Sequence, residues 1–267
     1  MNWRLWSLVG LVAAITIVVF LFPAIPQSES YHNFADTRAF VGIPNALNVL
    51  SNAFFLIVGL LGMHYVLHNA RDASAVGFLD PRERWTYFIF FLGVALTTFG
   101  SAYYHAHPND ARLVWDRLPM TLGFMSLSAA TLNERVGVNT GSRAIVPLLI
   151  FGVASVAYWS VTQSHGHGDL RPYVLAQFGS LLVLLLLVAL FSPRYTRGSD
   201  LIASLGIYAL AKAFEAVDRP IFNLGGIVSG HTLKHIAAAL SAYWILRMLQ
   251  LRSPVPPLIS RAAPVQA

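Results

Sequence analysis

The chain has 267 residues, of which 56% are hydrophobic and 11% charged, whereas an ordinary soluble domain has about 25% charged residues. This composition predicts a membrane protein. The formal net charge of +6 does not indicate nucleic-acid binding, because the basic residues are scattered singly and form no cluster with interleaved aromatic residues. The sequence contains no cysteine, which excludes disulfides and thiolate metal sites. Any transition metal must therefore be held by histidine and carboxylate side chains.

The first predicted membrane span runs from Trp3 to Phe22 and carries no charge after Arg4. At 1.5 Å per residue it is long enough to cross a hydrocarbon core of roughly 30 Å. Two interpretations stay open, a retained signal anchor and a signal peptide cleaved near Ser28-Glu-Ser30. The length of the apolar run favours retention. Either way, Tyr31 is expected to lie outside the membrane.

Seven further apolar runs predict the rest of a helical bundle. They are Ala46 to Leu67, Trp85 to Tyr104, Leu113 to Leu132, Ala144 to Val161, Tyr173 to Phe191, Leu201 to Val217 and Gly230 to Leu249. Most loops between them are short, so neighbouring helices should pack antiparallel. We therefore predict an all-α, polytopic membrane helix bundle, with a seven-helix core in residues 31–252 and an additional N-terminal transmembrane helix in residues 1–30. The proline-rich residues 253–267 are predicted to be a disordered tail.

The arginines favour one orientation, because short cytoplasmic loops of membrane proteins are enriched in Lys and Arg. With the N-terminus inside, eleven arginines fall in inner segments and five in outer segments. The inner set is Arg4, Arg71, Arg82, Arg84, Arg135, Arg143, Arg194, Arg197, Arg247, Arg252 and Arg261, and the outer set is Arg38, Arg112, Arg117, Arg171 and Arg219. This bias predicts that both termini are cytoplasmic and that His105, Asp116 and His231 lie near the outer face.

Two pairs of polar residues four apart point to a metal site. Ser101 and His105 share one helix face, as do His231 and His235. His105 ends an outward-going span and His231 begins an inward-going one, so the three imidazoles can meet at the same depth. Three neutral imidazoles leave one position open on a tetrahedral zinc, the arrangement of a catalytic site. Water bound there has a pKa of roughly 7. The alternative is a set of buried histidines that hydrogen-bond to their neighbours.

The other histidines fit such a site less well. His64 and His68 have the same spacing but fall at the inner end of their span, and we expect them to be interfacial. His165 and His167 lie in a glycine-rich outer loop, which is either solvated or a second metal-capture site. His107 is expected to be a loop residue, with a replacement of His105 as the alternative.

Asp116 and Ser101 are candidate catalytic residues. A carboxylate within a membrane span raises the free energy of membrane insertion by about 2.5 to 3.5 kcal/mol, so Asp116 is expected to have a specific role. It is either a general base for the metal-bound water, or a member of an ion pair with Arg117, or a water-exposed helix end. Ser101 either stabilises an oxyanion or only packs between helices, as serine often does.

The remaining charges near the spans have simpler explanations. Lys212 and Glu215 are three apart on one helix and should neutralise each other. Lys234 is one residue away from His235, so we expect it to point elsewhere or to snorkel. Asp218 and Arg219 precede Pro220 at the outer end of a span and are expected to face water.

The order of these motifs resembles the alkaline ceramidase family. The resemblance rests on Ser101-Ala-Tyr-Tyr-His105, on Asp116 followed by Leu118-Pro119-Met120, on His231-x-x-x-His235, and on Leu47-Asn-Val-Leu-Ser-Asn52. It covers residues 31–244, and the combined order is specific although each motif alone is weak. The family belongs to a superfamily of seven-helix zinc proteins that includes the progestin and adipoQ receptors. The resemblance implies that His105, His231 and His235 bind Zn²⁺, that Asp116 activates water and that Ser101 lies near the substrate carbonyl.

One family feature is not carried over. Eukaryotic members have an acidic calcium site before the first core helix, where this chain offers mainly Asn33, Asp36, Asn45 and Asn48. A single carboxylate does not make a tight calcium site. Asp36 is expected to pair with Arg38 or to cap the following helix instead.

The resemblance implies a zinc-dependent hydrolase in a bacterial cytoplasmic membrane, with its metal site near the outer face. It would cleave the amide bond of a ceramide-like lipid from the bilayer to a free fatty acid and a sphingoid-type amine. The alternative is a zinc-containing receptor-like or structural membrane protein without hydrolase activity. A transporter is a third interpretation, with Lys212 and Glu215 on a polar pathway, but polarity is concentrated at the outer mouth, which disfavours transport.

Overall fold

The computed structural model describes residues 3–68 and 77–256, and that part of the chain is helical without β-strands. The elements are α1 (Trp3–Leu21), η1 (Glu29–His32), α2 (Ala46–Leu50), α3 (Ala53–His68), α4 (Glu83–Ala106), α5 (Asp110–Arg135), α6 (Val138–Ser164), α7 (Arg171–Val174), η2 (Leu175–Gly179), α8 (Ser180–Leu190), α9 (Ser199–Ala216), α10 (Asp218–Gly225) and α11 (Gly230–Leu251). The predicted all-α bundle is confirmed, because each of the eight predicted spans coincides with a helix or a short series of helices. The short helix α10 was not predicted.

Five of the described helical segments are long and apolar enough to cross a membrane. They are Trp3–Leu21, Ala46–His68, Glu83–Ala106, Val138–Ser164 and Arg171–Leu190. The other three long helices, α5, α9 and α11, carry Asp116, Glu215 and Lys234 among their residues. These side chains line a cavity inside the bundle, so the less apolar helices are the ones that build the interior. The chain therefore has the character of a membrane protein.

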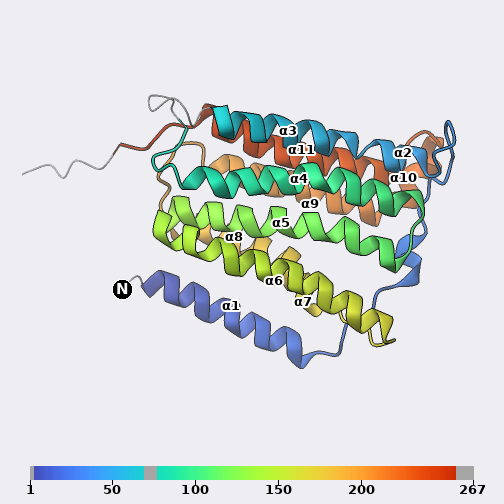
Figure 1. Cartoon of the computed structure of the whole chain (residues 1–267), viewed down its shortest axis with the longest axis horizontal. Coiled ribbons are helices and arrows are strands. Elements are labelled where there is room, and N and C mark those ends of the chain that lie inside the picture. The colour runs from blue at the N-terminus through green and yellow to red at the C-terminus, as the bar shows by residue number, and fades with distance from the viewer. Residues whose placement is uncertain (1–2, 69–76, 257–267) are drawn as a thin grey trace, which may run out of the picture.

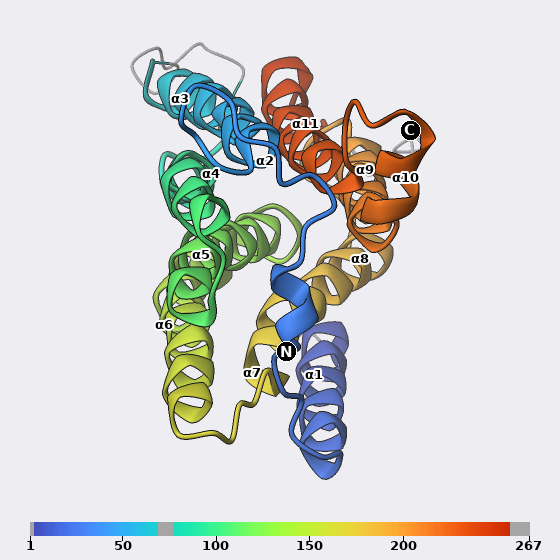
Figure 2. The same cartoon turned by 90° about the vertical axis from the view of Figure 1, so that its right-hand side faces the viewer.

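The core helices run roughly along one common direction (Figure 1), and Figure 2 shows them from one end. Helices α4, α5 and α6 pack side by side on one side, with α3 against α4, while α9 and α11 pack against each other and α8 contacts α5. The N-terminal helix α1 lies at the edge of the bundle (Figure 1), where Leu8 packs with Leu187 and Phe191. Leu8 is the one buried residue of α1, as expected for a helix added to the outside of a core.

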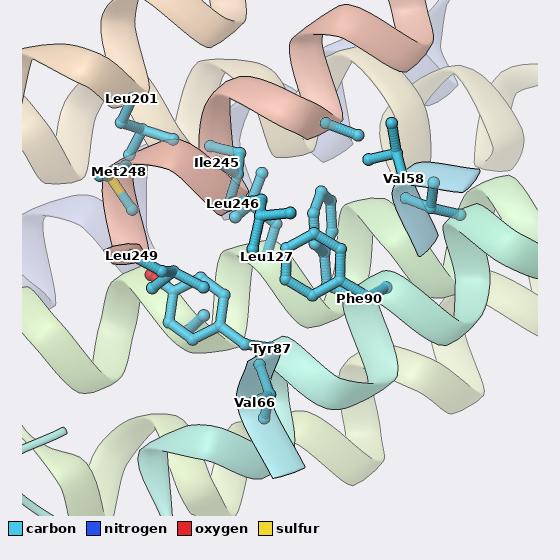
Figure 3. Close-up of a cluster of buried hydrophobic side chains, with 14 of the residues drawn as sticks. Val58, Val66, Tyr87, Phe90, Leu127, Leu201, Ile245, Leu246, Met248 and Leu249 are labelled. Carbon is cyan, nitrogen blue, oxygen red and sulfur yellow. The ribbon is translucent and has the colours of Figure 1, made fainter. Parts of the chain in front are cut away.

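A large hydrophobic cluster joins α3, α4, α5, α8, α9 and α11. Figure 3 shows Tyr87 and Phe90 of α4 close to Leu127 of α5 and to Ile245 and Leu246 of α11. Each of these side chains is buried, and because lipid tails are as apolar as these residues, the helices associate here through close van der Waals packing. The aromatic and aliphatic contacts fix how α11 sits against α4 and α5.

The end of the bundle where α4 ends and α11 begins is called the histidine end below. Residues 22–45, between α1 and α2, run across this end (Figure 2). Arg38 fixes this segment, because it donates to both carboxylate oxygens of Asp36 and to the carbonyls of Gly226 and Ile227. The guanidinium of Arg38 also lowers the pKa of Asp36 below its usual value. Of the two roles expected for Asp36, the structure shows the pair with Arg38.

The C-terminal segment is anchored at the opposite end. The backbone N–H of Thr196 donates to the carbonyl of Ser253, and that of Val255 donates to the carbonyl of Arg194, although residues 253–267 were predicted to be a disordered tail. The pairing was not visible in the sequence because it depends on a loop about sixty residues earlier. Residues 257–267 lie outside the described part of the chain.

A close contact between α4 and α5 brings the two candidate catalytic residues together. A Cβ atom added at Gly100 would lie 1.9 Å from the carbonyl oxygen of Trp115. Only glycine allows the two backbones to approach this closely. The following residues, Ser101 and Asp116, are therefore neighbours across the interface.

We expect Gly100→Ala to destabilise the protein by about 1 to 3 kcal/mol, because α4 and α5 must move apart. Thermal unfolding of the purified protein in detergent measures this change. Gly206→Ala in α9 is the matched control, since a Cβ there meets no atom within 4 Å and alanine favours a helix. Equal unfolding temperatures for the two variants would contradict the assignment of Gly100 as a contact residue.

Candidate metal centre

Three histidines from two helices meet at the histidine end. His105 lies in the last turn of α4, and His231 and His235 lie in the first two turns of α11. Their side chains are almost completely buried, with residue exposures of 0%, 4% and 2%. One ring nitrogen from each lies within 4.8 Å of the others. The predicted meeting of the three imidazoles is therefore what the structure shows.

The geometry of the cluster fits a metal ion. Nε2 of His231 lies 3.2 Å from Nε2 of His105, and two nitrogens bound to one tetrahedral zinc at 2.0 to 2.1 Å would be roughly 3.3 to 3.4 Å apart. His105 Nδ1 and His235 Nε2 are buried and have no hydrogen-bond partner in the described part of the chain. Buried polar atoms normally have partners, and a metal ion would supply one to His235. The three histidines could thus hold a metal ion.

Helix capping fixes the register of the two α11 histidines. Ser229 accepts from the backbone N–H of Thr232, as an N-cap residue does. Asp218, at the start of α10, accepts from the backbone N–H of His231 at 2.7 Å and from that of Ala35 at 2.8 Å. Arg219 is exposed, as expected, whereas Asp218 is only partly exposed, because the turn between α9 and α11 brings its carboxylate against the start of α11.

A break between α2 and α3 positions the polar side chains that contact the start of α11. The side-chain amide of Asn52 donates to the backbone carbonyl of Asn48 at 2.8 Å, which gives this carbonyl near the end of α2 a hydrogen-bond partner. Ser51, beside it, forms a hydrogen bond with Nδ1 of His235 at 2.8 Å. Asn48 accepts from the hydroxyl of Thr232 at 2.9 Å. These contacts fix the orientation of His235, whose other nitrogen, Nε2, is the one without a partner.

Loss of the Ser51 hydroxyl is expected to weaken metal binding. A hydrogen bond to the far nitrogen of a ligating histidine fixes its tautomer and ring orientation, and its removal typically costs 10- to 100-fold in metal affinity. We expect Ser51→Ala to lower metal affinity by about that factor, measured by competition with a chelator. Ser164→Ala is the control, since Ser164 is exposed and bonds only locally. Unchanged affinity in Ser51→Ala would show that this hydrogen bond does not support the site.

Asp116 and Ser101 face each other beside the histidines. They are 6% and 2% exposed, the hydroxyl of Ser101 lies beside the carboxylate of Asp116, and both line a cavity together with His235. Asp116 is not part of the group of donor atoms within 4.8 Å. Neither simple alternative for Asp116 holds, because it is buried and the ion pairs of the described residues do not include one with Arg117.

The cavity has a volume of about 390 Å³, which is in the range of small-molecule sites. Its polar part is near the histidine end, and its deeper part is lined by apolar residues that include Phe90, Val94, Phe124, Leu127, Ala238 and Ala242. A second, apolar pocket shares Phe178, Leu181, Leu205, Tyr208 and Lys212 with it and extends to Leu185 and Ala209. The cavity therefore continues between the η2–α8 segment and α9.

Three charged residues that line the cavity form one cluster. Lys212 and Lys234 both pair with Glu215, the latter at 3.1 Å, and the Tyr31 hydroxyl donates to Glu215 at 3.2 Å. The predicted pairing of Lys212 with Glu215 is confirmed, and Lys234, which was expected to point elsewhere or to snorkel, directs its ammonium group to Glu215. The sequence did not reveal that Lys234 reaches Glu215, because the contact depends on how α9 packs against α11.

The remaining histidines do not join the metal centre. His64 and His68 stack on each other with ring centroids 4.8 Å apart, at the end of α3 far from the histidine end (Figure 1). His107, His165 and His167 are exposed. Sequence spacing correctly separated His105, His231 and His235 from these competitors, since in the described part of the chain no other group of three possible ligands is found.

Taken together, the fold and the site define a class: a helical membrane protein with a buried triple-histidine group beside an interior cavity. No family model matches the chain, and no curated protein matches it.

Proposed function

We propose that this protein is a zinc-dependent membrane hydrolase that cleaves the amide bond of a ceramide-like lipid, in the manner of the alkaline ceramidases that its motifs resemble. The observation that carries the proposal is the position of Asp116 and Ser101. Both lie on the wall of the cavity beside His235, where a carboxylate and a hydroxyl can act on a substrate without being metal ligands.

The donor set suits zinc. In the described part of the chain the three clustered ligands are all imidazoles, and three histidines with one open position are typical of catalytic zinc. When bound, zinc would supply Lewis acidity and lower the pKa of water at its open position to about 7. The protein would supply the rest of the chemistry through the cavity wall.

Each residue has a distinct role in the proposed reaction. Asp116 acts as general base, takes a proton from the attacking water and returns it to the leaving amine. The hydroxyl of Ser101 donates a hydrogen bond to the substrate carbonyl oxygen as negative charge develops there. The deep apolar part of the cavity, lined by Phe90, Val94 and Leu127, holds the acyl chain in an environment that excludes water.

The arrangement also suits a substrate that arrives from the bilayer. The continuation of the cavity between the η2–α8 segment and α9 is apolar, so a lipid chain could enter sideways without crossing water. The π-helical segment η2 contributes Gln177 and Phe178 to the cavity wall, and such segments are frequent at functional sites. The arginine bias of the loops favours an orientation with the metal centre near the outer face, and the resemblance to bacterial members of the family favours a bacterial cytoplasmic membrane.

A zinc-containing receptor-like or structural protein is the alternative. In that case the metal would only hold α4 and α11 together, and a structural zinc site is closed by four protein ligands. The group found here has three and borders a cavity through His235, which favours the hydrolase.

Purified wild-type protein tests the proposal directly. Zinc is measured by elemental analysis, and fatty-acid release is followed from a ceramide labelled in its acyl chain. One zinc per chain together with release of labelled fatty acid is the expected result. Zinc without cleavage of any amide lipid would favour the receptor-like alternative, and absence of zinc would reject the metal centre.

A further inference from the structure

Arg117 is a buried cation that the proposed mechanism does not use. It follows Asp116 in α5, is 5% exposed and lines the same cavity. Its guanidinium stacks on Trp159 and Tyr173, with 4.2 and 4.6 Å between Cζ and the ring centroids. Gln27 accepts from Nη2 at 2.6 Å. Nη1 has no hydrogen-bond partner in the described part of the chain.

A buried guanidinium in this position needs an anion as its partner. Arginine stays charged in proteins and offers five N–H donors in a fork that suits a carboxylate or phosphate. A buried charge without a counter-charge is strongly unfavourable. The ion pairs of the described residues do not include Arg117. The ring centroid of Tyr31 lies 5.8 Å from the Arg117 Cζ, but the Tyr31 hydroxyl donates to Glu215.

The other charged residues of the cavity do not neutralise this cation. Lys212 and Lys234 share the single carboxylate of Glu215. The cavity lining therefore carries three cationic side chains, with Arg117 as the third, and two carboxylates, Asp116 and Glu215. This polar end of the cavity thus has an excess of positive charge that a substrate could balance.

The two ends of the cavity determine how a bound substrate is oriented. The acyl chain belongs in the apolar depth, while Asp116 delivers its proton to the leaving amine. Arg117 is next to Asp116 in sequence and lines the cavity together with Gln27 and Tyr31. The amine half of the substrate, and not the acyl half, therefore faces Arg117.

We propose that Arg117 binds a carboxylate on the amine half of the substrate, so that the site takes N-acyl amino acids in addition to ceramide-like lipids. This rests on the proposed amide hydrolysis. Water adds its oxygen to the acyl carbon, the carbon–nitrogen bond breaks and the nitrogen takes a proton through Asp116, which gives a fatty acid and a free amino acid. Arg117 is a specificity residue and does not take part in bond cleavage.

A matched pair of amides tests the proposal on the full-length protein in detergent. N-Dodecanoylglycine carries the carboxylate, and N-dodecanoylethanolamine has the same chain and amide but a neutral hydroxyl. We expect wild type to have a KM about 10- to 100-fold lower for the glycine conjugate, since charge-assisted hydrogen bonds are the strong ones. Arg117→Gln should bring the two KM values together, because KM for the glycine conjugate rises by about 10- to 100-fold once the cation is lost.

Two further variants separate charge from folding. Arg117→Lys keeps the cation and should retain part of the preference, which matters if Arg117→Gln fails to fold. Arg112→Gln removes a cation from the same helix, one that stacks on Tyr103 outside the cavity, and should keep the full preference. Equal loss of both substrates in Arg117→Gln, or no preference in wild type, would overturn the proposal.

Binding without turnover distinguishes failure of the subsite from failure of the proposed function. The rise in unfolding temperature caused by each amide is measured on Asp116→Asn, with and without Arg117→Gln. If neither amide is cleaved by wild type but only the glycine conjugate stabilises through Arg117, the subsite stands and hydrolysis fails. Dodecanoate, the fatty-acid product, is measured in the same way. If Arg117→Gln reduces the rise in unfolding temperature caused by dodecanoate but leaves the preference between the two amides unchanged, Arg117 binds the carboxylate of the acyl half and the proposal is overturned.

Discussion

Replacing His231 with alanine is expected to remove the metal and abolish lipid amide hydrolysis. His231 supplies one of three imidazoles whose donor atoms lie within 4.8 Å, and its Nε2 is 3.2 Å from that of His105. Loss of partners one layer further out already costs 10- to 100-fold in metal affinity or activity, so loss of a ligand should cost at least about 100-fold in each. Zinc content falls from one per chain toward zero, measured by elemental analysis alongside release of labelled fatty acid.

His167→Ala is the matched control for this prediction. His167 is an exposed loop histidine outside the cluster, so its loss should change neither zinc content nor turnover. Circular dichroism and size exclusion establish that both variants remain folded. Full zinc occupancy in folded His231→Ala would rule out His231 as a ligand and with it the three-histidine centre.

Asp116→Asn should have the second large effect, because it separates metal binding from turnover. Asparagine has nearly the same shape as aspartate but cannot accept a proton at neutral pH. General-base catalysis typically contributes 10²- to 10⁴-fold, so we expect kcat to fall by about that factor. Zinc content should stay at the wild-type level, since Asp116 lies outside the group of three ligands.

Asp110→Asn provides the control on the same helix. Asp110 contacts His32 at 3.0 Å and Gln163 at 2.9 Å and does not line the cavity, so its amidation should leave kcat within a few fold of wild type. If Asp116→Asn also lost its zinc, Asp116 would be a ligand and the assignment of its role would be wrong. If Asp116→Asn kept full turnover, the general base would have to be another residue.

The positions of the helices could be predicted from the sequence with good accuracy. The predicted first span from Trp3 to Phe22 coincides with α1 (Trp3–Leu21), and the predicted last span from Gly230 coincides with α11. Long apolar runs are strong signals, since each must cover a hydrocarbon core. Helix α10 was missed because it is short and follows α9 directly, so that no apolar run marks it.

The clustering of the three histidines could also be predicted from the sequence. Residues four apart share a helix face, so His231 and His235 could be paired by their spacing alone. Antiparallel spans then brought His105 to the same end. The structure confirms this grouping, because it depends only on helical periodicity and on the alternating direction of neighbouring spans.

The polar and charged contacts around the three histidines depend on the tertiary structure alone. The bond between Ser51 and His235 spans 184 residues, and Lys234 reaches Glu215 only because α9 packs against α11. Arg117 was expected near the outer mouth, with an ion pair to Asp116 as one possibility, yet it is buried on the cavity wall against Trp159 and Tyr173. Periodicity fixes which residues of one helix share a face, but the rotation and distance of packed helices depend on side-chain volumes along their whole length. The sequence by itself therefore determined the helices and the grouping of the three histidines, and the packing of the helices decided which charged side chains line the cavity.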